Sequence, residues 1–211
     1  MEGVVTMNVL VACEFSGVVR EAFRKRGHNA WSCDLLPAED GSSFHYQCPV
    51  QFVMYATIDI EPWDLMIAHP PCQFMANSGV RWLTTQSGRW DDLRWATKFF
   101  LDLWNAPIPR IAIENPVMHK YAKEQIGVRQ SQTIQPWQFG HPESKKTCLW
   151  LKGLPLLQPT HVMSLPESGH WRNQTPSGQN KLGPSPTRSA DRSRTYQGIA
   201  DAMAEQWGML P

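Results

Sequence analysis

The sequence is low in charge and lacks the features of membrane-spanning and repetitive proteins. Charged residues make up 18% of its 211 residues, the formal net charge is +1, and there is no internal repeat. No run of about 18 apolar residues is present to cross a bilayer, so we expect a soluble protein without a membrane partner. Hydrophobic residues reach 42%, which is typical of a globular domain. The length favours one α/β core rather than two.

Disulfide and targeting signals are also missing. Residues 1–15 lack the basic flank and the small-residue cleavage site of a signal peptide, so we interpret them as leading into a first strand and expect a cytoplasmic location. The five cysteines are odd in number and form no CxxC pair, which favours a reducing compartment. His45 and Cys48 lie three residues apart without a second ligand pair nearby, so no metal site is expected.

Strand-like and helix-like patterns alternate along the first 157 residues. β-Branched apolar runs predict strands at 7–13, 28–34, 63–70 and 109–116, and residues 57–60 are a further strand or the end of one. Helical spacing of apolar residues predicts helices at 17–27, 89–104 and, more polar, 117–125. Residues 35–56 look irregular, and 132–140 with 145–153 predict a hairpin. This order predicts an α/β fold: a Rossmann-like, doubly wound, mostly parallel sheet with an antiparallel edge hairpin.

The composition changes after residue 157. Residues 158–194 are rich in Pro, Ser, Gly, Asn, Gln and Arg and have no apolar periodicity, which predicts a long flexible loop. Residues 195–211 contain a last amphipathic helix that ends near Gly208. We therefore expect a core domain at 1–157, a loop at 158–194 and a helix at 195–211 that packs back on the core.

Residues that follow the strands are candidates for ligand binding, because ligands of open α/β sheets lie outside the carboxyl ends of the strands. Phe15, Ser16 and Gly17 form a turn in which the glycine allows close backbone approach and the aromatic ring can face a nucleobase. Asp34 stands where an acidic side chain binds ribose hydroxyls, and Asp59 could accept from an adenine amine. The pattern predicts an adenosine site.

A cysteine follows two prolines after the strand at 63–70. Pro70 and Pro71 fix the backbone and remove two amide donors, so the thiol of Cys72 is held in a defined position. A free cysteine is usually a small buried hydrophobe. Glu114 favours a catalytic interpretation, because a neighbouring strand would place its carboxylate facing the Cys72 loop, and a nucleophile beside a carboxyl acid is a pair for covalent catalysis.

These motifs resemble those of the DNA cytosine-5 methyltransferases. HPPCQ at 69–73 resembles the Pro-Pro-Cys-Gln nucleophile motif of the family, and ENP at 114–116 resembles its Glu-Asn-Val motif. CEFSG at 13–17, with the two aspartates that follow the next strands, resembles its S-adenosylmethionine-binding motifs. FGHPESKKT at 139–147 is similar to its Phe-Gly-Val-Pro-Gln-Arg-Arg-x-Arg segment, and the agreement in order covers residues 7–152.

The resemblance implies a methyltransferase catalytic domain at 1–157 that methylates C5 of cytosine in DNA with S-adenosylmethionine as cofactor. Cys72 would add to C6 as a thiolate while Glu114 protonates or hydrogen-bonds N3, on a nucleotide that is flipped out or single-stranded. The implied cofactor-binding residues are Phe15, Ser16, Gly17, Asp34, Asp59 and Pro70. The implied substrate-binding residues are Pro71, Gln73, Ser78, Asn115 and Lys145.

Other interpretations stay open, because the loop at 158–194 stands where the family usually carries a target-recognition domain. The substrate could be single-stranded nucleic acid, RNA or a free nucleotide, or a partner protein could supply recognition. The basic residues of the loop favour a polyanion: Arg172, Lys181, Arg188, Arg192 and Arg194. Cys72 speaks against an amino-methyltransferase, which typically has an aromatic residue after the prolines. A catalytically inactive binding protein is the remaining alternative, and the small size suits a phage or mobile-element protein.

Overall fold

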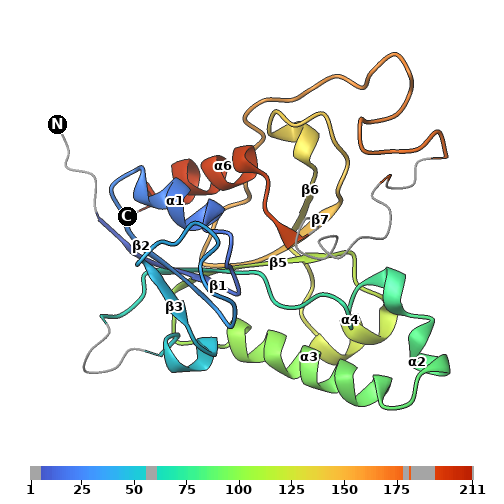
Figure 1. Ribbon diagram of the computed structural model, residues 1–211, viewed down its shortest axis with the longest axis horizontal. Coiled ribbons are helices and arrows are strands. Elements are labelled where there is room, and N and C mark those ends of the chain that lie inside the picture. Colours follow the sequence, from blue (N-terminus) through green and yellow to red (C-terminus); the bar gives the residue numbers. More distant parts are fainter. Residues whose placement is uncertain (1–5, 56–60, 178–180, 182–192, 211) are drawn as a thin grey trace.

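The computed structural model describes residues 6–55, 61–177, 181 and 193–210, which form a seven-stranded sheet with the strand order β3-β2-β1-β4-β5-β7-β6 (Figure 1). The strands are β1 (Asn8–Ala12), β2 (Asn29–Asp34), β3 (His45–Gln47), β4 (Leu65–Ala68), β5 (Arg110–Pro116), β6 (Gln132–Ile134) and β7 (Thr147–Lys152). The first five in chain order pair in parallel, and β7 lies antiparallel between β5 and β6. The predicted parallel sheet with an antiparallel edge hairpin is confirmed.

Helices cover both faces of the sheet. They are α1 (Val18–Arg24), α2 (Trp82–Thr85), α3 (Arg89–Trp104), α4 (Lys120–Ile126) and α6 (Gln197–Trp207). In Figure 1, α1 and α6 lie side by side above the sheet, and α3 and α4 lie below it. In the part of the chain that the structure describes, no helix is long and apolar enough to cross a membrane.

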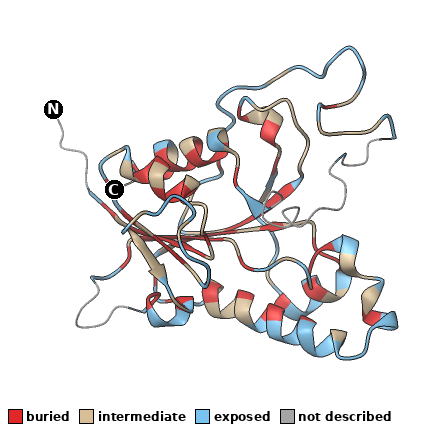
Figure 2. Ribbon diagram, viewed as in Figure 1, coloured by how far each residue is buried: buried red, intermediate tan, exposed pale blue. Residues whose placement is uncertain are grey.

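The core has two halves because successive residues of a strand point to opposite faces. Val9 and Val11 of β1 pack in one cluster with Phe23 of α1, and Leu10 packs in the other with Phe100 of α3. All four residues of β4 are buried, as its continuous apolar run predicts for a strand covered on both faces. The buried residues accordingly concentrate along the sheet and on the helix sides that face it (Figure 2).

The irregular structure expected at 35–56 is only partly correct. Residues 45–47 form β3, which pairs with β2, and Val50–Phe52 form a 3-10 helix. The segment is polar because it is a sheet edge and not a core strand: the ring of Tyr46 stacks on Trp31 at 4.8 Å between centroids, and Ser32 Oγ is 2.8 Å from His45 Nδ1. The strand expected at 57–60 lies outside the described residues.

The connection within the edge hairpin is longer than the sequence suggests. β6 ends at Ile134, and the 3-10 helix Pro136–Gln138 begins two residues later with a proline, which cannot donate to a strand ladder. Residues 135–146 therefore join β6 to β7. Described residues of 158–177 pack on this connection: the rings of Trp137 and Trp171 stack, and Ser144 and Asn173 exchange two hydrogen bonds of 2.9 Å. This part of the segment is irregular but is held by specific contacts.

Gly17 is required by the turn that leads into α1. It has φ 73°, and a Cβ at this position would overlap the guanidinium of Arg20. Arg20 is fully buried and donates to Glu21, Ser32 and Asp40, so its guanidinium has little room to move. Gly17 therefore allows the left-handed backbone of the turn and also leaves the space that the buried guanidinium of Arg20 occupies.

We predict that Gly17→Ala lowers the free energy of unfolding by about 3 kcal/mol, because backbone strain and the clash with Arg20 add. Gly27→Ala is the matched control, since Gly27 has φ 87° but nothing within 4 Å of an added Cβ, and should lose about 1 kcal/mol. Urea unfolding of the two variants measures the difference. Equal losses would show that Arg20 does not restrict position 17.

Candidate active site

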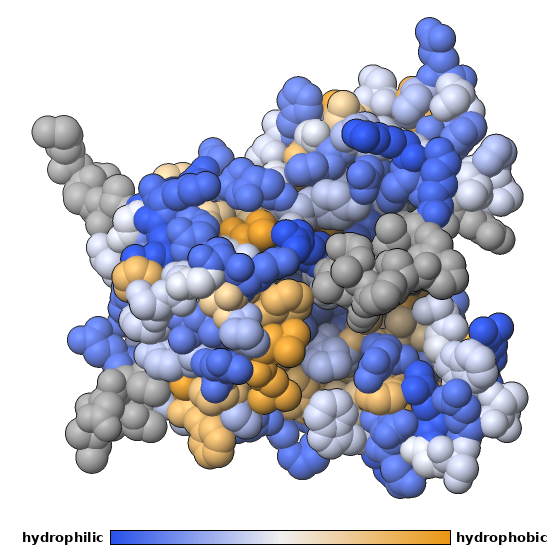
Figure 3. All heavy atoms as spheres, viewed as in Figure 1, coloured by the Kyte–Doolittle hydropathy of each residue, from blue (hydrophilic) through white to orange (hydrophobic). Residues whose placement is uncertain are grey.

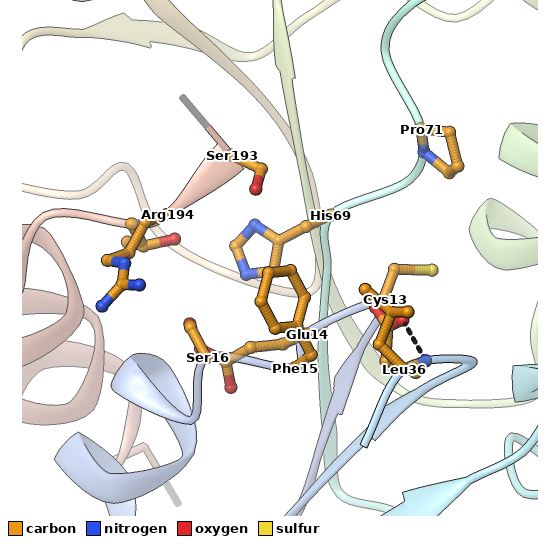
Figure 4. Close-up of a pocket in the computed structure, with 11 residues that line it drawn as sticks. Cys13, Glu14, Phe15, Ser16, Leu36, His69, Pro71, Ser193 and Arg194 are labelled. Atoms are coloured by element: carbon orange, nitrogen blue, oxygen red, sulfur yellow. Dashed lines mark hydrogen bonds between the residues drawn. The ribbon is translucent and has the colours of Figure 1, made fainter. Parts of the chain in front are cut away.

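A cavity of about 180 Å³ lies at the carboxyl ends of β1, β2 and β4. Phe15 and Ser16 enter it from the turn after β1, His69 and Pro71 from the loop after β4, and Arg194 from the segment before α6 (Figure 4). In Figure 4 the Phe15 and Ser16 side chains face His69, with Arg194 on one side and Cys13 and Leu36 on the other. Segments distant in sequence therefore share one pocket at the predicted edge of the sheet.

The turn after β1 is held by a buried carboxylate. Glu14 Oε1 accepts from the backbone N–H of Val19 at 2.8 Å and from Ser16 Oγ at 3.3 Å, and Oε2 accepts from the N–H of Arg20 at 3.2 Å. Glu14 thus binds free amides at the start of α1, as a capping side chain does, and fixes the turn. Phe15 and Ser16 line the pocket, whereas Gly17 shapes the turn from behind.

Asp34, a predicted cofactor-binding residue, lines the pocket at the end of β2. Its Oδ1 accepts from the backbone N–H of Leu36 at 2.9 Å, which leaves the rest of the carboxylate for a ligand. The loop after it is held by a chain of hydrogen bonds: Arg20 Nη1 contacts Ser32 Oγ at 2.8 Å, Ser32 contacts His45 Nδ1, and His45 Nε2 lies 2.9 Å from the carbonyl oxygen of Leu36. Asp59, the remaining predicted aspartate, lies outside the described residues.

The exposed surface near the pocket includes apolar side chains. Leu35 and Leu36, directly after Asp34, are 68% and 53% exposed. Hydrophilic residues cover most of the face shown in Figure 3, and an apolar patch lies between the level of α1 and that of α3. The pocket therefore continues onto surface that can hold an apolar or aromatic group.

The second thiol of the region, Cys13, also lines the pocket. Burial, and to a smaller extent the Asp34 carboxylate, raises the pKa of Cys13 to about 12. Cys13 therefore stays protonated at neutral pH and is not suited to act as a nucleophile, because the thiolate is the reactive form.

The two motifs that carry the predicted catalytic residues meet at neighbouring strand ends. Ala68 of β4 is opposite Ile113 of β5, so the next residues, His69 and Glu114, lie side by side. His69 Nδ1 is 3.0 Å from Glu114 Oε2, and Asn115 Nδ2 donates to the carbonyl oxygen of Pro70 at 3.3 Å. These contacts hold the start of the Cys72 loop against the end of β5.

Cys72 is half-buried and begins a tight turn, since its carbonyl oxygen accepts from the N–H groups of Met75 and Ala76 at 3.0 and 2.8 Å. Gln73 is exposed, and its carbonyl oxygen accepts from Arg89 Nη2 at 2.7 Å. Ser78 is exposed in the 3-10 helix Asn77–Gly79 and does not line the pocket. Pro71 does line it, and Pro70 is buried behind it.

Lys145 reaches the same region from the connection before β7. Its Nζ donates to the carbonyl oxygen of Arg194 at 3.4 Å and lies 5.7 Å from the centroid of the Tyr196 ring. The connection also holds the start of α6, because His141 Nε2 accepts from the N–H of Gly198 at 2.9 Å. Lys145 is therefore positioned near Glu114 by contacts with the last helix.

Glu114 and His69 form a charged pair. Burial raises the pKa of Glu114, but the hydrogen bond from His69, the charge of Lys145 and a hydrogen bond from Thr195 outweigh it and lower the pKa to about 2. Burial likewise lowers the pKa of His69, but the hydrogen bond and charge of Glu114, with the charge of Glu14, outweigh it and raise the pKa. Glu114 is ionised at neutral pH.

Two buried polar atoms of the site have no hydrogen-bond partner among the described residues: His69 Nε2 and Asn115 Oδ1. Buried polar atoms without a hydrogen-bond partner are rare in folded proteins, and a catalytic or binding role is one explanation for them. The sequence left open whether His69 is a local base or a satisfied loop histidine, and it assigned no role to Glu14 or Thr195. The available signals were the acidic residue Glu14 just before a helix and the histidine His69 at a strand end. Only the fold shows that both line one pocket and that His69 contacts Glu114.

No protein-family model and no curated protein matches the sequence. Among solved structures, one described as a DNA modification methyltransferase encoded within a prophage, from E. coli, matches with a TM-score of 0.50 and 14% identity over 78% of this chain and 54% of that one. Two others are the methyltransferase EhMeth of Entamoeba histolytica (TM-score 0.45, 15% identity, 75% and 58% covered) and the Dnmt2 methyltransferase of S. pombe (0.40, 17%, 72% and 51%).

These comparisons concern the fold. The chain spans about half the length of the solved structures that it matches. At 14% identity, the match to the prophage-encoded protein shows that the sheet and its helices follow the fold of that methyltransferase. The fold by itself leaves the chemistry to be argued from the site.

The His69–Glu114 pair predicts a pH-dependent stability. Because the pKa of Glu114 is lowered from 4.5 to about 2, its contribution is present above pH 4.5 and is lost as the pH falls toward 2. Because the pKa of His69 is raised from 6.5, its contribution is present below that pH and is lost as the pH rises through the higher value. Between pH 5 and 2.5 the wild type should lose about 2 kcal/mol more unfolding free energy than Glu114→Gln.

Urea unfolding between pH 7 and 2.5 measures this loss. Glu205→Gln is the control, since Glu205 is an exposed partner of Arg26 and should follow the wild type. Parallel curves for the wild type and Glu114→Gln would contradict the charged pair.

Proposed function

We propose that the protein is an S-adenosylmethionine-dependent methyltransferase that modifies C5 of cytosine in nucleic acid, with DNA as the first substrate to test. The observation that carries the proposal is the meeting of the Cys72 loop and the Glu114 strand end beside a pocket lined by Phe15, Ser16 and Asp34. The methyltransferase fold supports it, as does the similarity to the prophage-encoded protein, which is described as a DNA modification methyltransferase.

The side chains of the pocket fit S-adenosylmethionine in chemical type. Phe15 offers an aromatic face for adenine, Asp34 a carboxylate for the ribose hydroxyls, and Arg194 with the hydroxyl of Ser16 suits the charged methionine end. The cavity of about 180 Å³ is smaller than the roughly 300 Å³ or more of typical ligand sites, so part of the cofactor would lie over the exposed surface at Leu35 and Leu36. When bound there, the cofactor would supply an electrophilic methyl group.

The residues of this chain would activate the cytosine ring. The Sγ thiolate of Cys72 forms a bond to C6, the C5=C6 electron pair shifts to C4=C5, the C4=N3 pair moves onto N3, and N3 takes up a proton, which makes C5 a carbon nucleophile. After methylation, a water molecule takes the C5 proton, the C5–H electron pair forms C5=C6, and the Sγ–C6 bond breaks, which restores the aromatic ring and the thiolate. Pro70 and Pro71 hold the thiol, and Asn115 fixes their loop through the carbonyl oxygen of Pro70.

Glu114 is the side chain suited to act at N3, and Lys145 to contact a phosphate or the target nucleotide. The charge of Lys145 faces Glu114, and Arg194, which is paired with Glu39 at 2.7 Å, borders the same pocket. Cations of this kind hold a polyanion without reading its sequence.

A second candidate is the same C5 chemistry on single-stranded nucleic acid, RNA or a free nucleotide. It is favoured by the segment 158–194, whose described residues pack on the β6–β7 connection as irregular chain and not as a separate recognition fold. Substrate class, and whether a partner protein supplies recognition, are therefore parts of the test.

We predict that DNA containing 5-fluorocytosine, incubated with the protein and S-adenosylmethionine, gives a covalent adduct that survives a denaturing gel. Fluorine at C5 cannot leave as a proton, so the Sγ–C6 bond is not broken. Cys72→Ser should abolish the adduct, and Cys48→Ser, which alters a half-buried thiol outside the pocket, should keep it. An adduct formed by Cys72→Ser would contradict covalent catalysis by Cys72. The absence of an adduct between the wild type and duplex DNA, single-stranded DNA or RNA would contradict this mechanism for nucleic-acid substrates.

Cofactor binding is predicted to depend on Asp34. Asp34→Asn keeps an oxygen for the N–H of Leu36 but removes the charge that would bind ribose hydroxyls, so the Kd for S-adenosylmethionine should rise about 10-fold or more. Isothermal titration calorimetry measures it, with Glu205→Gln as an unaffected control. An unchanged Kd in Asp34→Asn would place the ribose elsewhere.

A further inference from the structure

His69 is a buried titratable residue to which the mechanism above assigns no task. Its Nδ1 contacts Glu114 Oε2 at 3.0 Å, and its Nε2 is buried without a hydrogen-bond partner among the described residues. Charged groups face it from every side: Glu114 on β5, Glu14 after β1, and Lys145 before β7, with Arg194 across the pocket. The Glu114 carboxylate is the main group that stabilises an imidazolium, Glu14 adds to it when ionised although burial raises its pKa, and Lys145 opposes it more weakly.

The proposed chemistry requires a proton that Glu114 does not hold by itself. Thiolate addition to C6 drives electron density to N3, and the step is easier when N3 is protonated as the bond forms. The ionised Glu114 can accept a hydrogen bond but has no proton to give. Thr195 carries a hydroxyl that does not ionise at neutral pH, so of the two side chains that hydrogen-bond Glu114, His69 is the one that can carry an extra proton.

We propose that His69 and Glu114 share one proton and that the pair delivers it to N3 of the target base, with His69 acting through Glu114 as a positioning residue. This inference rests on the proposed function and deepens it. As Sγ bonds to C6, the proton of Nδ1 passes to Glu114 and a proton passes from Glu114 to N3. The charges balance, because the thiolate charge and the imidazolium charge disappear together. When the thiolate leaves, N3 returns the proton to the pair.

The first test needs no substrate. NMR of protein with ¹³C- and ¹⁵N-labelled histidine follows the ring signals between pH 5 and 9, and His69→Gln identifies the signal of His69. The midpoint of His69 should lie above that of the exposed His161 in the wild type and should fall by about one pH unit or more in Glu114→Gln. A midpoint at or below that of His161, or no response to Glu114→Gln, overturns the shared proton.

The second test measures release of tritium from cytosine labelled at C5, which reports the activation of the ring. His69→Gln keeps a side-chain N–H for Glu114 but cannot carry the proton, so release should slow about 100-fold. His161→Gln should match the wild type. The double variant with Glu114→Gln should be no slower than Glu114→Gln alone, because His69 acts through Glu114.

A pH–rate profile separates this role from a merely structural one. The wild-type profile should bend at the pH where His69 titrates by NMR, and the His69→Gln profile should lack that bend. A His69→Gln rate within about three-fold of wild type overturns proton delivery. If the wild type releases no tritium, the proposed function is overturned, and so is the delivery of a proton to the base. The NMR result then still decides whether His69 and Glu114 share a proton.

Discussion

The parallel pairing of β4 with β5 is the constraint on which the site depends. With Ala68 opposite Ile113, the next residue of each strand must lie beside the other, and these residues are His69 and Glu114. The strands are buried on both faces, so a shift in register would expose apolar side chains or bury polar ones. The hydrophobic core thereby sets the position of a charged pair and, through Asn115 and Pro70, the start of the Cys72 loop.

The cofactor side of the site uses buried charge in another way. Glu14 satisfies amides at the start of α1, although burial raises its pKa, and the buried charge of Arg20 is offset by hydrogen bonds to Glu21, Ser32 and Asp40. Fully satisfied networks of this kind contribute less to net stability than to a unique geometry. Here they fix two loops, the turn that carries Phe15 and Ser16 and the loop after Asp34, which together line the pocket.

Much of this arrangement could be predicted from the sequence. The spacing of apolar residues and the residues that end helices identified β1, β2, β4 and β5 and the helices at 89–104 and 197–207, because burial dictates those patterns. Phe15, Asp34 and Pro71 line the pocket because strand ends in such sheets meet at one edge. β3 was missed because edge strands need no apolar run, and the roles of His69 and Glu14 were missed because they arise from contacts between segments far apart in sequence.

The most direct test of the account is the identity of the methylated nucleoside. DNA, RNA and cytidine nucleotides would each be incubated with the protein and S-adenosylmethionine carrying a labelled methyl group, digested to nucleosides and separated by chromatography with mass spectrometry. The account predicts label in 5-methylcytosine from at least one substrate and none from Cys72→Ser. Label in N4-methylcytosine or N6-methyladenine, or equal labelling by Cys72→Ser, would contradict it.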